Sequence, residues 1–190
     1  EFRRVLFRSS AMRRRHTREE YLELVEQIRA AIPEVALSTD MIVGFPGETV
    51  ADFEETLSLV EAVRYHGMFS FKYSPRPNTL ALRRLPDDVA EQEKTARIVA
   101  LQGLQRKIQT ELNDAAVGTT RDVLVDSVSR RREGELSGRT SGNVVVNFSG
   151  PAEWMGRTVA VHIRRAGPHS LWGEAGLPDA HRRGGSEREQ

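Results

Sequence analysis

Two helix-length stretches with apolar side chains at helical spacing alternate with two short apolar runs in the first 77 residues. Each helical stretch opens with the capping-box pattern, a threonine followed three residues later by an acid: Thr17 with Glu20, and Thr49 with Asp52. The apolar runs 35–43 and 68–73 have strand length. Because the first run does not alternate with polar residues, we expect a strand buried on both faces, as in a parallel sheet. The order helix, strand, helix, strand predicts βα units.

A long helix follows, and the character of the sequence then changes. We expect Asp87 or Asp88 to cap this helix and Gly118 to stand at its C-terminal end. Beyond Gly118, short strand-like runs with glycines between them replace helical spacing: 123–125, 135–140, 143–148 and 158–163. Several short strands without a helix predict a small closed barrel. The domain boundary is therefore placed at residue 118, between an α/β part, 12–117, and an all-β barrel, 118–174.

Composition narrows the chemistry of the chain. Its 190 residues carry 28 Lys and Arg against 27 Asp and Glu, and contain no cysteine. The absence of cysteine excludes a disulfide scaffold, a zinc finger, a thiol nucleophile and an iron–sulfur cluster held by this chain. The five histidines show no metal-ligand spacing, so no metal site is expected. No apolar run reaches about 18 residues, so we expect no membrane span.

The two ends of the chain differ in composition from the rest. Residues 1–11 are basic and lack periodicity, and part of this stretch looks like translated cloning DNA, so we interpret it as an artefact or a disordered arm. Residues 175–190 are rich in Gly, Ala, Arg and Glu, which predicts a disordered tail. No secretory signal opens the chain, and a cytoplasmic location is expected.

The strongest local motif is the strand, glycine-containing loop and capped helix around residues 40–49. α/β proteins place ligands beyond the carboxyl ends of parallel strands, and glycines such as Gly44 let the backbone approach a ligand closely. Asp40 is a carboxylate within an apolar strand, so we expect it to have a partner or a ligand. The alternative is a simple turn, with Asp40 paired to a structural arginine. The pattern is not a Walker loop, because no Gly-Lys-Ser/Thr follows.

The second strand ends in Tyr73 and Ser74, followed by a proline-rich stretch. Adjacent parallel strands end at the same sheet edge, so these residues and the 40–49 motif can frame a pocket. The alternative is a rigid exit loop, which proline density alone favours. In the barrel, basic side chains on one face would fit an RNA backbone, although a run of charge is also typical of a solvated loop. The candidate RNA contacts are Arg121, Arg130, Arg131, Arg139 and Arg164.

Three stretches together carry a resemblance to a known family: residues 12–22, the motif 38–49, and the second strand with its proline-rich exit, 69–77. They resemble the radical SAM methylthiotransferases, in the branch that acts on tRNA. Residues 136–140 and 145–148 resemble the TRAM domain, an RNA-binding module that ends these proteins. The resemblance covers residues 12–174 in order. It implies the C-terminal part of a partial TIM-type barrel, followed by a small TRAM barrel of OB-like form.

The resemblance also implies a function. Members use S-adenosylmethionine and two [4Fe–4S] clusters to place a methylthio group on N6-isopentenyladenosine beside the tRNA anticodon. The cluster cysteines of the family lie upstream of the matched region, so this chain is expected to be an inactive fragment by itself. No residue is expected to act as a catalytic acid or base. The implied cofactor contacts, mostly through backbone, are Asp40, Gly44, Glu48, Tyr73 and Ser74.

The implied partners are the anticodon stem-loop of tRNA and S-adenosylmethionine, and we expect a monomer. The family commonly has Gly-Thr-Pro where this chain has Asn78, Thr79 and Leu80. Two alternatives remain open. One is a free-standing RNA-binding module with no enzymatic parent. The other is a sister methylthiotransferase that acts on threonylcarbamoyladenosine in tRNA.

Overall fold

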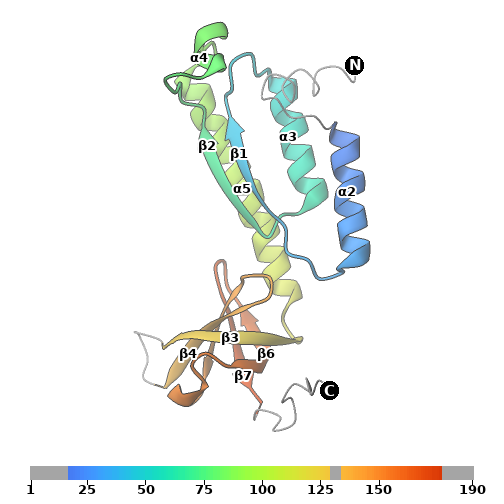
Figure 1. The fold of residues 1–190 in the computed structure, drawn as a ribbon, viewed down its shortest axis with the longest axis vertical. Helices are drawn as coiled ribbons and strands as arrows, with labels where there is room; N and C mark the ends of the chain where they lie inside the picture. Colours follow the sequence, from blue (N-terminus) through green and yellow to red (C-terminus); the bar gives the residue numbers. More distant parts are fainter. Residues whose placement is uncertain (1–16, 129–133, 177–190) are drawn as a thin grey trace, which may run out of the picture. The chain divides into compact units, whose positions relative to one another are not determined.

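A computed structural model describes residues 17–128 and 134–176 of the chain (Figure 1). Tertiary contacts divide it into two compact units, with the division between Leu112 and Asn113. The first unit is built of helices and a parallel two-stranded sheet, and the second is a closed barrel. The expected end segment 1–11 lies outside the described residues, as does the expected tail 175–190 from residue 177 onward. Ala175 was expected in the tail but is the last residue of a barrel strand.

The first unit follows the expected order of elements. Helix α2 (Arg18–Ala31) leads into strand β1 (Ser38–Val43), and helix α3 (Val50–Val63) leads into strand β2 (Gly67–Lys72). Both predicted capping boxes are confirmed, because Thr17 and Thr49 each accept from the third residue on, whose carboxylate accepts from the threonine backbone. The short helix α4 (Leu80–Arg84) then precedes the long helix α5 (Glu91–Ala115).

Strands β1 and β2 run parallel, with Ser38 opposite Gly67 and Val43 opposite Lys72. Apolar residues of α2, α3 and α5 pack with β1 into one core: Val25, Val43, Phe53, Val60 and Leu101. All three helices therefore contribute to covering one face of the sheet (Figure 1).

The prediction that β1 is buried on both faces is wrong. Its residues alternate, with Met41 and Val43 turned toward the helices, while Asp40 and Ile42 lie on the exposed face. The apolar run reflects a strand that has one covered face and an apolar uncovered one. Within the described residues, no element covers the second face.

The second unit is a five-stranded closed barrel in the order β3-β4-β5-β7-β6. All neighbours pair antiparallel except β5 with β7, which are parallel. This strand order is that of an OB-like barrel, as expected. Its strands are β3 (Thr120–Val128), β4 (Glu135–Thr140), β5 (Val145–Ser149), β6 (Thr158–Ala166) and β7 (Leu171–Ala175), with a 3₁₀ turn η1 (Ala152–Trp154) before β6.

Alternate residues of every strand fill the barrel interior, among them Val123, Leu136, Phe148, Val161 and Leu171, all at most 2% exposed. The sequence pattern did not predict β7, because this strand has only five residues, of which one is Gly173 and two face outward from the barrel. Gly173 is required there, since a Cβ would overlap backbone of β6 and a side chain of the core.

Candidate functional site

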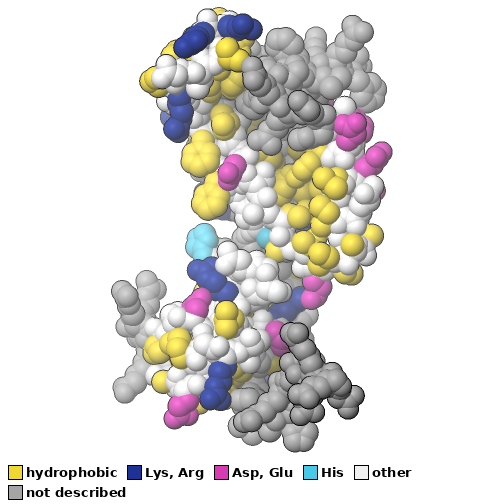
Figure 2. Space-filling model, viewed as in Figure 1, with side chains coloured by type: hydrophobic (Ala, Val, Ile, Leu, Met, Phe, Trp, Pro, Cys, Tyr) yellow, Lys and Arg dark blue, Asp and Glu magenta, His cyan; other side chains and the backbone are white. Residues whose placement is uncertain are grey.

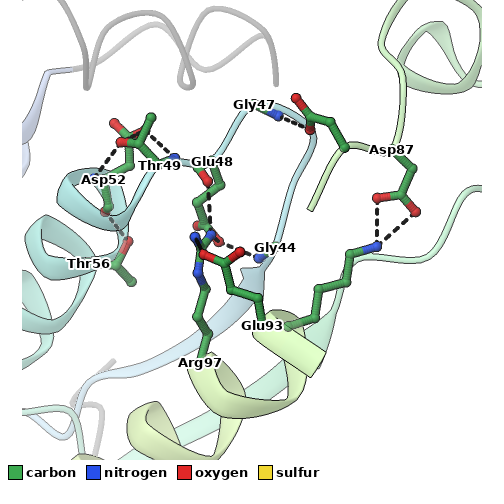
Figure 3. Close-up of polar contacts among 11 residues, drawn as sticks. Gly44, Gly47, Glu48, Thr49, Asp52, Thr56, Asp87, Glu93 and Arg97 are labelled. Atoms are coloured by element: carbon green, nitrogen blue, oxygen red, sulfur yellow. Dashed lines mark hydrogen bonds and ion pairs between the residues drawn. The ribbon is translucent and has the colours of Figure 1, made fainter. Parts of the chain in front are cut away.

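The loop between β1 and α3, residues 44–48, is held from inside by a buried ion pair (Figure 3). The Glu48 side chain is fully buried, and Arg97 of α5 donates to its carboxylate at 2.6 Å and to its carbonyl oxygen at 3.0 Å. The same carboxylate accepts the backbone N–H of Gly44. Arg97 also pairs with Glu93, so its guanidinium is shared between a buried and a half-exposed acid. A buried charge is tolerated only when it is paired in this way.

A second ion pair lies beside the first. The Lys94 side chain is 4% exposed, and its ammonium donates to both carboxylate oxygens of Asp87, at 2.6 and 2.8 Å. The ammonium also lies 5.4 Å from the ring centroid of Tyr73, a cation–π distance. The neighbouring Asp88 accepts the backbone N–H of Gly47 at 2.7 Å. The expected cap on α5 is therefore wrong, because Asp87 and Asp88 bind a lysine and the loop, and the helix begins at Glu91.

Two features of the chain itself require glycine at position 44, the backbone conformation and a close side chain. Its φ is +71°, and a Cβ there would overlap the Cγ of Lys94. The N–H groups of Gly44 and Gly47 go to carboxylates, and that of Glu48 goes to the carbonyl oxygen of Phe45 at 2.9 Å. These three backbone donors of the loop are therefore all bound to acceptors within the chain.

Tyr73 joins this cluster, while Ser74 does not. The Tyr73 N–H donates to the carbonyl oxygen of Val43 at 2.8 Å, which extends the sheet contact beyond β2. Its ring meets Phe45 edge to face, with centroids 5.1 Å apart. Ser74 is exposed. Of the five predicted cofactor contacts, the structure thus brings Gly44, Glu48 and Tyr73 together around α5.

Asp40 lies elsewhere, on the uncovered face of the sheet. It stands opposite Phe69 in the strand register, and Ile42 stands opposite Phe71. The exposed fractions of these apolar residues are 45% for Ile42, 69% for Phe69 and 53% for Phe71. Exposed hydrophobic side chains also stand out on the surface in Figure 2. Within the described residues the Asp40 carboxylate is exposed and has no hydrogen-bonding partner, so the alternative of a structural arginine is not observed there. The expected ligand contact at Asp40 stays a prediction.

Sequence reasoning missed Lys94 and Arg97. Both lie in the first two turns of α5, and the helix dipole disfavours a cation at the very start of a helix. Basic residues near a helix N-terminus are a signal of acidic tertiary partners, and here those partners are Asp87 and Glu48. The signal was readable once the helix start was placed correctly.

The predicted RNA contacts are scattered over the barrel. Arg139 pairs with Asp126 at 3.3 Å, and Arg164 pairs with Glu174 at 2.8 Å. Arg121 is half-buried and donates to Thr119 at 3.1 Å. Arg130 and Arg131 lie outside the described residues. Two of the three described arginines are thus already paired with acids, which weakens the case for them as free phosphate contacts.

Two tyrosines and a histidine form a partly buried polar group in the first unit. The hydroxyl groups of Tyr21 and Tyr65 are 2.8 Å apart, and burial raises the pKa of Tyr65 well above its usual value. The neighbouring His66 has its Nδ1 buried without a partner among the described residues. Burial first, and then the charge of Arg29, lower the pKa of the His66 imidazole.

Comparison with known families decides what these units are. Residues 8–60 match the radical SAM superfamily, and residues 114–175 match the TRAM domain. The chain is therefore similar to the radical SAM superfamily in its first unit and to the TRAM domain in its second. Its first unit is hereafter the radical SAM unit, and its barrel the TRAM barrel. No helix in the described ranges is long and apolar enough to cross a membrane, and those ranges hold no cluster of three metal-ligating side chains.

Curated relatives agree with both matches. The chain is 51% identical over 163 residues to the tRNA-2-methylthio-N(6)-dimethylallyladenosine synthase of Geobacter metallireducens, covering 86% of this chain and 36% of the relative. The synthase of the same name from Halorhodospira halophila is 50% identical, over 85% and 34%. That from Acidithiobacillus ferrooxidans is 47% identical, over 87% and 37%. The resemblance to radical SAM methylthiotransferases is confirmed, and the chain spans just over a third of the length of these relatives.

Proposed function

We propose that this chain is part of an enzyme that adds a methylthio group to N6-dimethylallyladenosine in tRNA. The observation that carries the proposal is the joint occurrence of a radical SAM unit and a TRAM barrel in one chain, with about half the residues identical to synthases of that name. A free-standing RNA-binding module would not need the radical SAM unit. A sister enzyme for threonylcarbamoyladenosine is less favoured, because the three relatives described above share the dimethylallyl name.

The uncovered sheet face fits the nucleoside part of S-adenosylmethionine. A carboxylate such as Asp40 accepts hydrogen bonds from ribose hydroxyls, and the exposed rings of Phe69 and Phe71 offer apolar surface to an adenine. Bound there, S-adenosylmethionine would supply the radical chemistry of the superfamily. Glu48, whose carboxylate is buried, acts by shaping the loop, and Arg97 and Lys94 of α5 are positioning residues for that loop. Gly44, Tyr73 and Ser74 remain candidates for contact with S-adenosylmethionine at the sheet edge where this loop lies.

The iron–sulfur clusters are a different case. The chain has no cysteine, so it offers no thiolate to a [4Fe–4S] cluster. We therefore expect the chain alone to be inactive. After reconstitution with iron and sulfide, it should release no 5′-deoxyadenosine from S-adenosylmethionine above a control without protein.

A chimera tests the proposal directly. Residues 12–176 of this chain replace the matching segment of the Geobacter metallireducens relative, in cells that lack the modification. Mass spectrometry of tRNA nucleosides should then detect the 2-methylthio derivative of dimethylallyladenosine. A stable chimera that yields no methylthio product, or only one on threonylcarbamoyladenosine, would overturn the assignment.

A further inference from the structure

The outer surface of the TRAM barrel carries one row of side chains that crosses four strands. The strand register places Ser137 of β4 opposite Asn147 of β5, Asn147 opposite Trp172 of β7, and Trp172 opposite Arg165 of β6. The neighbours Leu136, Phe148 and Leu171 are buried in the core, so this row points outward. We refer to these four residues, Ser137, Asn147, Trp172 and Arg165, as the outer row.

A β-bulge puts Arg165 in the outer row. Val161 and Ile163 of β6 point into the core, and regular alternation would also turn Arg165 inward. The pairing with β7 shifts between Ile163 and Arg165, leaving Arg164 as an extra residue. The shift brings Arg165 opposite Trp172, on the outer surface. Bulges commonly re-aim a side chain in this way, often at functional positions.

Trp172 holds the redirected guanidinium in place. The guanidinium carbon of Arg165 lies 4.3 Å from the centroid of the Trp172 ring, well within the cation–π range. On another side the ring packs so close to Gly167 that a Cβ there would lie 2.7 Å from it. Arg165 is exposed and, within the described part of the barrel, no carboxylate pairs with it. Arg139 and Arg164 differ in this respect, because each is paired with an acid.

We propose that Arg165, supported by Trp172, is a stacking platform for an unpaired RNA base. Guanidinium planes and aromatic rings are the surfaces on which proteins stack splayed bases, and Asn147 and Ser137 continue the row with groups that can hydrogen-bond a base or ribose. The positive charge of Arg165 would attract the RNA phosphate next to the stacked base. OB-like barrels bind oligonucleotides across their outer strands. This inference rests on the proposed function in tRNA modification. It assigns the RNA contact to Arg165 in place of Arg139 and Arg164, which are paired with acids.

The test compares two conservative variants of the whole chain. Arg165→Lys keeps the charge and loses the plane. Arg157→Lys makes the same change at another exposed barrel arginine that has no carboxylate partner among the described residues. Fluorescence anisotropy measures binding to an anticodon stem-loop RNA and to a fully paired RNA duplex. We expect Arg165→Lys to raise the Kd for the stem-loop about five- to tenfold. Arg157→Lys should leave this Kd within about twofold, and neither variant should change duplex binding.

A second readout does not depend on affinity. In a Trp154→Phe background, Trp172 is the only tryptophan of the chain, so its emission reports on the platform. Stem-loop RNA should change this emission at saturation, and duplex RNA should leave it unchanged.

The outcomes separate the two proposals. Equal stem-loop binding by the wild type and Arg165→Lys, or an equal loss on duplex, would overturn the platform and leave the proposed function standing. Saturated stem-loop binding with unchanged Trp172 emission would do the same. A wild-type chain that binds neither RNA would overturn the platform and count against tRNA as the partner.

Discussion

The two units of the chain differ in how far they bury a phenylalanine side chain in a strand. Phe148 of the TRAM barrel is 2% exposed, whereas Phe69 of the radical SAM unit is 69% exposed, although both lie in regular strands. The barrel closes on itself, so each strand has two neighbours and every inward side chain meets another. The sheet of the radical SAM unit has two strands, and the described helices that pack against it share one core. The barrel is held by its own core, and the radical SAM unit is held by helix packing and by ion pairs at its loop.

The largest expected effect contrasts those two phenylalanines. Phe148→Ala removes a ring from a closed core and should lower the free energy of unfolding of the barrel by about 3–5 kcal/mol. Phe69→Ala removes a ring that is mostly in water, and should change stability by less than about 0.5 kcal/mol. Denaturant unfolding, with a probe in each unit, measures both. A loss of similar size for Phe69→Ala would mean that the uncovered face is packed in solution.

Next in size is the buried ion pair at the loop. Arg97→Leu leaves the Glu48 carboxylate buried without its partner, which should cost the radical SAM unit about 3 kcal/mol. The matched control is Arg64→Leu, because Arg64 pairs with Glu111 at 2.7 Å with both side chains about 40% exposed. That half-exposed pair should contribute at most about 1 kcal/mol. Equal losses in chemical unfolding would show that Glu48 does not depend on Arg97.

The glycines of the loop give a smaller contrast. Both have positive φ, +71° for Gly44 and +78° for Gly47, so alanine is strained at either by about 1–2 kcal/mol. Only at Gly44 does a Cβ also meet Lys94, while nothing lies within 4 Å at Gly47. Gly44→Ala should therefore destabilise the radical SAM unit more than Gly47→Ala does. Thermal unfolding of the two variants ranks them, and the reverse order would contradict the close contact with Lys94.

The smallest expected effect is a dependence on pH confined to the radical SAM unit. Burial and Arg29 lower the pKa of His66 in the folded state, so the unfolded chain takes up a proton first as pH falls. The stabilisation is complete above the usual histidine pKa of about 6.5 and is lost as pH falls from there toward the folded pKa. His66→Gln should flatten this dependence in unfolding measurements between pH 7 and pH 5. An unchanged slope in this variant would assign the dependence to other groups.

Much of the fold was predictable because it depends on local signals. The threonine capping boxes placed the starts of α2 and α3, and the glycine turns marked out most of the barrel strands. What local patterns do not contain is the partner of a residue. An apolar run in β1 reads as burial on both faces, and only tertiary structure shows that Ile42 is exposed.

The candidate sites also combine local signals that the sequence contains with tertiary partners that it does not reveal. The motif around Gly44 was found in the sequence, but its geometry depends on Lys94 and Arg97, some fifty residues further along the chain. For RNA binding, the sequence points to arginines in or near runs of basic residues. The register shift in β6 separates Arg165 from its neighbour Arg164, and a shift of one residue in strand pairing is invisible to composition.

We propose that the two units have separate roles, the uncovered sheet face in binding the cofactor and the TRAM barrel in binding the RNA. The most direct measurement uses the chimera with the Geobacter metallireducens relative, carrying Asp40→Asn. Product formation is followed by mass spectrometry of tRNA nucleosides, and tRNA affinity is measured on the same protein. We predict at least a tenfold loss of methylthio product with an unchanged Kd for tRNA. Full product formation, or a parallel loss of tRNA binding, would contradict this separation of roles.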